Sequence, residues 1–278
     1  MFKQRLISGI ALVAVTVLGL YLGGIVTLLL TAIVALIGYN EILKIFNIEK
    51  SSLAVLGYTG TILYYAALFF DLGQWSTSII ILFMIFLLGC YVVRFPKYHM
   101  NQVMACFFGF VYVSVMISYI YQLRIAQNGG EFIVLLFLAA WGNDTLAYCT
   151  GMLIGKHKMT PKLSPKKSIE GLIGGILGAV ILGAAYGIYL KTRIRFNFNP
   201  MMMFGIICGI GAAISVIGDL AAFAHKPAGE ACAGDCALRI LRALIPGHGG
   251  ILDRFDSIIL IAPVIYYLTM MISGGTMQ

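Results

Sequence analysis

Charged residues are scarce in this chain, and their scarcity excludes most soluble folds. Only 11% of the 278 residues are Asp, Glu, Lys or Arg, whereas 60% are hydrophobic. A soluble domain of this length has no use for so much apolar surface. A chain that crosses a bilayer several times does, because each helical span takes about 20 mostly apolar residues. The composition therefore predicts a polytopic membrane protein.

Two other features that the chain lacks, a cleavage site and a complete zinc pattern, argue against a cleaved secretory leader and a zinc site. Residues 1–20 have the basic start and apolar run of a signal peptide, but they contain no convincing small-x-small cleavage site, and further apolar runs come after them. Four of the six cysteines lie singly in apolar runs. Cys232 and Cys236 have no nearby Cys or His pair that would complete a zinc pattern. We expect a retained first helix and structural cysteines.

The chain also lacks a basic, aromatic-rich module that would recognise a nucleobase, so we expect no nucleic-acid partner. Its formal net charge of +8 instead suits anionic lipid headgroups or phosphate groups.

Apolar runs separated by charged residues, Gly or Pro predict nine transmembrane helices and an all-α fold. They cover approximately residues 6–22, 24–43, 53–70, 76–93, 102–121, 132–153, 171–190, 201–223 and 255–273. The first two are separated only by Gly23-Gly24 and form either a tight hairpin or one broken unit. We predict N-terminal scaffold helices in residues 1–130 and a C-terminal catalytic region in 131–278, within one integrated membrane domain. With the N-terminus in the cytoplasm, fifteen of the nineteen Lys and Arg residues fall on the cytoplasmic side, as the positive-inside rule requires.

The stretch from Trp141 to Gly171 places polar groups inside a predicted span. Asp144 lies about 18 Å along a helix that enters near Phe132. An ionisable group at such depth costs several kcal/mol unless it faces a polar cavity or a partner, so its default interpretation is functional. Asn143 beside it adds a neutral ligand or hydrogen-bonding group. The alternative to a functional role for these polar residues is a structural hydrogen bond between helices.

A cationic loop comes after this span and precedes the next helix, which begins near Ser168 and Gly171. Serine and lysine side chains at a helix N-terminus suit a phosphate group, although the lysines alone also fit a positive-inside anchor. The loop is not a P-loop, because its glycines are too close together and His157 replaces the Ser or Thr that would bind magnesium. The lysines are Lys156, Lys158, Lys162, Lys166 and Lys167.

A second set of polar residues lies toward the C-terminus, at the predicted cytoplasmic interface. Asp219 ends one span, and Asp253 and Asp256 are three residues apart, so they lie on one helical face. With Asp144, these carboxylates predict a site for one or two Mg²⁺ ions that bridge nucleotide phosphates. His248 is flanked by glycines, where the backbone can approach a ligand closely.

The segments NDTxAYxxGxxxGKxKxxPxxSPKKSxEG, GDL and PGHGGxLDRFDS, in this order, resemble the CDP-diacylglycerol synthase (phosphatidate cytidylyltransferase) family. The resemblance implies transfer of CMP from CTP to phosphatidic acid, with CDP-diacylglycerol and pyrophosphate as products. It also implies nine helices, Mg²⁺ dependence and compatibility with a monovalent cation. The resemblance further implies a homodimer in the bacterial inner (plasma) membrane, with a polar cavity open to the cytoplasm and the lipid.

On this basis we assign three groups of residues. The catalytic residues are Asp219, Lys166, Lys167, His248 and Arg254. The substrate-binding residues are Asn143, Asp144, Lys156, Ser164, Ser168 and Lys226. The metal ligands are Asp219, Asp253, Asp256 and Asp144.

Residues 223–243 depart from the family pattern. Phe223 stands where the family has Ser, and Pro227 stands where it has Arg. A natural insertion and a local shift of reading frame both explain such a segment.

Two rival functions use the same features. A polyprenol kinase would also use CTP but would release CDP. A transporter would use the carboxylates to bind its substrate, but the chain shows no internal repeat with matching broken helices.

Overall fold

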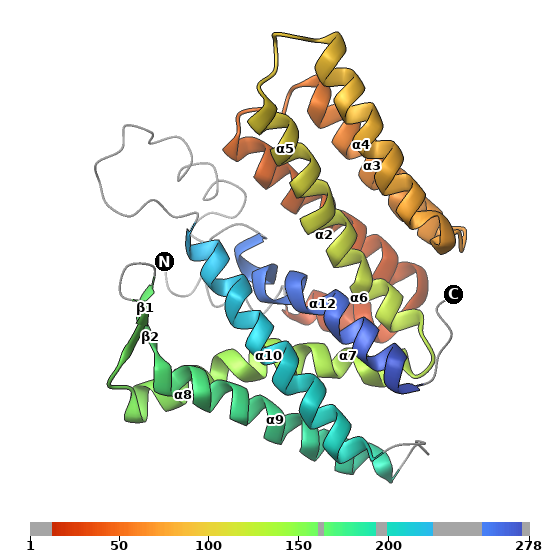
Figure 1. Ribbon diagram of the computed structural model, residues 1–278. Helices are drawn as coiled ribbons and strands as arrows, with labels where there is room; N and C mark the ends of the chain where they lie inside the picture. The colour runs from red at the N-terminus through yellow and green to blue at the C-terminus, as the bar shows by residue number, and fades with distance from the viewer. Residues whose placement is uncertain (1–12, 161–163, 193–198, 225–251, 274–278) are drawn as a thin grey trace. The chain divides into compact units, whose positions relative to one another are not determined.

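The computed structural model describes residues 13–160, 164–192, 199–224 and 252–273, and these are almost wholly helical (Figure 1). Eight helices in this part of the chain are long and apolar enough to cross a membrane, and a shorter apolar helix, Val13–Leu22, precedes them. The prediction of an all-α polytopic membrane protein is confirmed. The first predicted span, 6–22, is described only from residue 13 onward.

The chain divides into two compact units. The first contains the helices up to Ile125 together with the start of the last helix. The second contains the helices from Ala126 onward and the last helix from Phe255. The predicted division near residue 130 into scaffold and catalytic regions stays a prediction.

The first unit is built around a buried tyrosine. Its elements are α2 (Gly24–Ile45), α3 (Ser52–Phe69), the short η1 (Gly73–Trp75), α4 (Ser76–Val93), α5 (Met100–Gly109), the π-helical η2 (Phe110–Val115) and α6 (Met116–Ile125). The Tyr39 side chain on α2 is fully buried and its hydroxyl donates to the carbonyl of Cys106 at 3.2 Å. A Cβ at Gly57 would collide with the same hydroxyl, so this glycine lets α3 approach α2.

The Gly23-Gly24 break forms a tight hairpin. Both glycines have positive φ angles, 68° and 48°, which end one helix and start the next. The hydroxyl of Thr27 donates to the carbonyl of Gly19 at 2.9 Å, and a Cβ on Gly19 would meet Leu30 at 2.6 Å. Residues this far apart in sequence touch only if the chain folds back on itself, which excludes one broken but straight unit.

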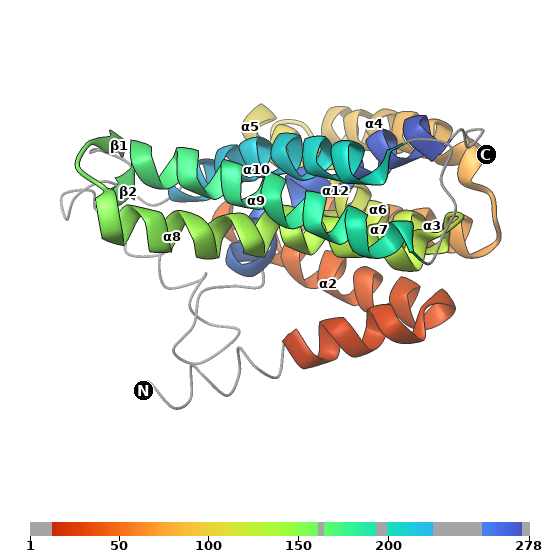
Figure 2. The same ribbon diagram turned by 90° about the horizontal axis from the view of Figure 1, so that it is seen from below.

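The second unit holds the elements that carry the polar motifs. They are α7 (Gly129–Phe137), the π-helical η3 (Leu138–Gly142), α8 (Asn143–Ile154), β1 (Lys158–Thr160), β2 (Ser164–Ser168), α9 (Ile169–Lys191), α10 (Pro200–Ala224) and α12 (Leu252–Ser273). The first three form one continuous span, Gly129–Ile154. Figures 1 and 2 show α9 lying alongside both α8 and α10.

Glycines on α9 allow its close contact with α8. A Cβ at Gly174 would collide with Thr150, and one at Gly178 would collide with Leu146. At Gly175 it would lie 2.6 Å from the Asn143 side-chain oxygen. Small residues at this spacing permit two membrane helices to approach backbone to backbone. This packing brings the polar start of α8 against α9.

The cationic loop contains a β-hairpin that the sequence pattern does not predict. Strands β1 and β2 pair antiparallel, with Lys158 opposite Ser168. The carboxylate of Glu170 accepts hydrogen bonds from the backbone N–H groups of Lys156 and His157 at 3.1 and 3.2 Å and contacts the His157 ring nitrogen at 2.6 Å. The hairpin is therefore fastened to the first turn of α9.

Candidate active site

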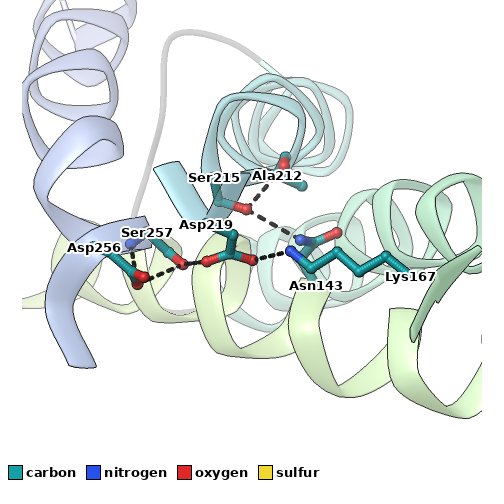
Figure 3. Close-up of polar contacts among 7 residues, drawn as sticks. All are labelled: Asn143, Lys167, Ala212, Ser215, Asp219, Asp256 and Ser257. Carbon is teal, nitrogen blue, oxygen red and sulfur yellow. Dashed lines mark hydrogen bonds and ion pairs between the residues drawn. The ribbon is translucent and has the colours of Figure 1, made fainter. Parts of the chain in front are cut away.

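An ion pair joins the two polar motifs that the sequence places 52 residues apart. The Lys167 ammonium, at the end of β2, donates to Oδ2 of Asp219 on α10 at 2.8 Å (Figure 3). The Lys167 side chain is 30% exposed and that of Asp219 is 15% exposed. Because the pair is partly shielded from water, its attraction is screened less than that of a surface pair.

Two residues of α12 complete the surroundings of Asp219. The Ser257 hydroxyl donates to Oδ1 of Asp219. The backbone N–H of Ser257 donates to the Asp256 carboxylate at 2.7 Å, so Asp256 lies beside the same cluster (Figure 3). Three elements, β2, α10 and α12, thus meet at one carboxylate.

Asp144 is the fourth charged member of this cluster. Its carboxyl group is close enough to Asp219, Lys167 and Asp256 to interact electrostatically with all three. The side chain is exposed, so a ligand can reach it. The π-helical segment η3 ends directly before α8. A π segment adds a residue to a helical turn and rotates the rest of the helix, which is a common device at functional sites.

Asn143 has a different environment from its neighbour. It is 1% exposed, and its amide nitrogen donates to the Ser215 hydroxyl on α10 at 3.0 Å (Figure 3). Ser215 in turn donates to the carbonyl of Ala212 at 2.9 Å. Within the described residues, the Asn143 side-chain oxygen has no hydrogen-bond partner. Asn143 therefore forms a structural hydrogen bond between helices, which is the alternative to a functional role given above. Its contact with a substrate stays a prediction.

The structure brings together four of the predicted site residues: Asp144, Lys167, Asp219 and Asp256. Ser168 is buried and caps α9, because its hydroxyl accepts from the N–H of Gly171 at 3.1 Å. Lys156 is exposed two residues after the end of α8. Lys226 and His248 lie outside the described residues. Ser164, Lys166, Asp253 and Arg254 lie in described strands and helices, but their side chains are outside the description.

Comparison with known proteins identifies the group to which the chain is related. A family model described as the cytidylyltransferase family matches residues 3–272. The chain belongs to the cytidylyltransferase family. It is therefore an enzyme of the nucleotidyltransferase class, and the resemblance that its motifs indicate is confirmed.

Curated relatives match over nearly their whole length. The chain is 28% identical to phosphatidate cytidylyltransferase of Staphylococcus saprophyticus over 275 residues, which are 97% of this chain and 100% of that protein. It is 28% identical to the enzyme of the same name from Staphylococcus haemolyticus over 270 residues, covering 96% and 98%. It is 29% identical to the enzyme of the same name from Staphylococcus aureus strain COL over 271 residues, which are 96% of this chain and 98% of that protein.

The carboxylate oxygens of Asp144 and Asp219 suit magnesium. The Asp144 and Asp219 carboxyl groups are close enough to repel one another electrostatically, and a bound cation would relieve that repulsion. Among the described residues, no three His, Cys, Asp or Glu side chains are close enough to hold a metal by themselves. Mg²⁺ needs no such cage, because it is usually bound by one or two carboxylates together with substrate phosphates and water. The pair therefore fits a metal shared with a triphosphate.

Three residues that organise the site are absent from the sequence-based assignment. Ser257 comes four residues after Asp253, and Ser215 precedes Asp219 by four residues, so each serine shares a helical face with a predicted ligand. Glu170 comes after the lysines and binds back to the loop before them. A search for hydroxyls at helical spacing from each predicted ligand would have found the two serines. Glu170 carries no comparable signal.

Proposed function

We propose that the chain catalyses the Mg²⁺-dependent transfer of CMP from CTP to phosphatidic acid, with CDP-diacylglycerol and pyrophosphate as products. The names of its relatives support both substrates. The single observation that carries the proposal is the 2.8 Å contact between Lys167 and Asp219, because it unites a phosphate-binding cation with a metal-binding carboxylate.

The reaction is a substitution at phosphorus. A phosphate oxygen of phosphatidic acid attacks the α-phosphorus of CTP and forms a new P–O bond. The bond from the α-phosphorus to the bridging oxygen breaks, and its electron pair leaves with pyrophosphate. Since the attacking oxygen is already anionic, no strong general base is needed. The protein has to neutralise charge and hold the two substrates in line.

The clustered side chains are suited to this task. Lys167 is close enough to Asp219 to neutralise a phosphate bound there. Mg²⁺, when bound at Asp144 and Asp219, would polarise phosphate oxygens and neutralise the charge that develops on the leaving pyrophosphate. Asp253 and Asp256 are further candidates to hold this ion, Lys166 to neutralise phosphate, and His248 with Arg254 to orient the nucleotide.

The location is part of the proposal. The excess of Lys and Arg in the predicted cytoplasmic segments supports an active site on the cytoplasmic side of the bacterial inner membrane, where CTP is available. The homodimer rests on the family resemblance alone.

The test is turnover of α-labelled CTP by the purified full-length protein in micelles that contain phosphatidic acid, with and without Mg²⁺. We expect labelled CDP-diacylglycerol and an equal amount of pyrophosphate, both dependent on Mg²⁺. Release of CDP instead of pyrophosphate would identify a lipid kinase. Substrate movement across liposomes without nucleotide turnover would identify a transporter.

Variants of the carboxylates test the site itself. Asp219→Asn and Asp256→Asn should each lower turnover by about 100-fold or more, because each removes a charge close to the reacting phosphates. Asp71→Asn is the matched control, since Asp71 is exposed in the first unit at φ 57°, a conformation that Asn also tolerates. Retained turnover in both site variants would refute the assignment.

A further inference from the structure

The Ser257 hydroxyl lies between two acids that come from different helices. Ser257 is 5% exposed and is in the second turn of α12. Its hydroxyl donates to Oδ1 of Asp219 and lies 3.4 Å from Oδ1 of Asp256. A hydroxyl has one proton to donate. The shorter contact takes that proton, so the side chain links α12 to Asp219 on α10, while the Ser257 backbone N–H holds Asp256.

Both oxygens of Asp219 consequently have a partner. Lys167 binds Oδ2 and Ser257 binds Oδ1, and the two donors come from different parts of the unit (Figure 3). Two donors on opposite oxygens prevent the carboxylate from rotating about its last side-chain bond. The direction in which its remaining lone pairs point is then determined by the fold.

A bound polyphosphate would affect the two donors to Asp219, Lys167 and Ser257, differently. Lys167 is a 30% exposed cation, so an incoming phosphate competes with Asp219 for it. Ser257 is neutral and buried, and an anion exerts no comparable attraction on it. Of these two donors, Ser257 is the one that keeps its bond to Asp219 when a polyphosphate is bound.

We propose that Ser257 is a positioning residue, which orients the Asp219 carboxylate for metal binding and keeps it oriented while Lys167 contacts the substrate. This inference rests on the proposed function, since it concerns the same site. Hydrogen bonds to metal-binding carboxylates commonly change metal affinity or activity by about 10–100-fold when they are removed. Loss of the hydroxyl should therefore weaken metal binding, whereas a merely structural serine would affect only folding.

The experiment measures binding of Mn²⁺, as a probe for Mg²⁺, to the full-length protein in detergent micelles by electron paramagnetic resonance. We expect Ser257→Ala to weaken Mn²⁺ binding by about 10–100-fold, and Ser257→Thr, which keeps the hydroxyl, to restore most of it. Thr269→Val removes another buried hydroxyl from α12, one that donates to Ile265, and should bind Mn²⁺ as the wild type does. If Ser257→Ala does not fold, Ser257→Cys takes its place, because a thiol has similar size but is a weak donor.

Three outcomes would overturn the inference: no Mn²⁺ binding by the wild type, equal binding by Ser257→Ala, or an equal loss in Thr269→Val. The Mg²⁺ concentration for half-maximal CTP turnover provides the second readout and should rise in Ser257→Ala by the same factor as the Mn²⁺ dissociation constant. Failure of the proposed function would look different. The wild type would then bind Mn²⁺ in a Ser257-dependent manner but form no CDP-diacylglycerol.

Discussion

Replacement of Lys167 by Ala tests the contact on which the proposed function depends. The change removes the ammonium that donates to Asp219 at 2.8 Å and leaves that carboxylate with one partner fewer in a partly buried place. It also removes a cation from a cluster that contains Asp144 and Asp256. The remaining acids then repel one another and any incoming phosphate more strongly.

The expected effects on stability and on activity differ in size. A hydrogen bond to a charged group contributes about 1.5–3 kcal/mol. Exposure of 30% for Lys167 and 15% for Asp219 allows water to screen the pair, so we expect a loss of about 1–2 kcal/mol. The effect on kcat/KM for CTP should be larger, about 10²–10³-fold, as when one preorganised donor is removed from a transition-state binding site.

The assay pairs steady-state CTP turnover at saturating phosphatidic acid with thermal unfolding in the same detergent. Lys191→Ala is the matched control, because Lys191 is an exposed lysine in the last turn of α9. It should leave both quantities unchanged. Lys167→Arg keeps the positive charge but not the compact ammonium geometry, so it should recover stability more fully than turnover. If Lys167→Ala retains kcat/KM within about threefold while the ion pair is lost, Lys167 does not act on the reacting phosphates, and the reasoning from charge stabilisation fails.

Two further predictions concern the packing of Gly175 in the second unit and the hydrogen bond of Glu41 in the first. Gly175→Ala should lower the free energy of unfolding by about 1–3 kcal/mol, because its Cβ would lie 2.6 Å from the Asn143 oxygen. The control Gly89→Ala, with no neighbour within 4 Å, should be neutral or slightly stabilising in thermal unfolding, and equal destabilisation by both would contradict the packing argument. Glu41, 1% exposed, accepts the N–H of Leu252 at 3.0 Å, so Glu41→Ala should destabilise the protein by about 1–3 kcal/mol. Glu41→Gln keeps an acceptor and should remain within about 1 kcal/mol of the wild type; equal loss in both variants would show that the carboxylate charge matters instead.

Most of the helical architecture is predictable because its cause is local. Eight predicted spans match described helices closely, for example 76–93 with Ser76–Val93 and 171–190 with Ile169–Lys191. Each depends on an apolar run long enough to cross a bilayer. The cap at Ser168 and the close packing of Gly174 and Gly178 also arise from local rules, since serine favours helix starts and small residues favour helix contacts.

The features that escaped prediction have no signal in the local sequence pattern. The hairpin β1–β2 interrupts an otherwise helical chain, and its residues carry no strand pattern that distinguishes them from a loop. The sequence pattern also predicts neither the π-helical segment η3, directly before α8, nor that Asn143 is buried there while Asp144 is exposed. Adjacent residues on a helix point about 100° apart, so the amino-acid order alone does not show which one faces a partner.

The sequence by itself establishes the class of the protein, the positions of its spans and the family to which it belongs, because apolar run length and motif order are properties of the chain alone. It also identifies Asp144, Lys167, Asp219 and Asp256 as candidates, since charged groups are costly in or near a bilayer and need a function or a partner. Their mutual arrangement required the folded structure. Lys167 and Asp219 are 52 residues apart, and Ser257 is a further 38 away. Their contact depends on how β2, α10 and α12 pack and rotate, which is set by side-chain fit between helices that no local pattern encodes.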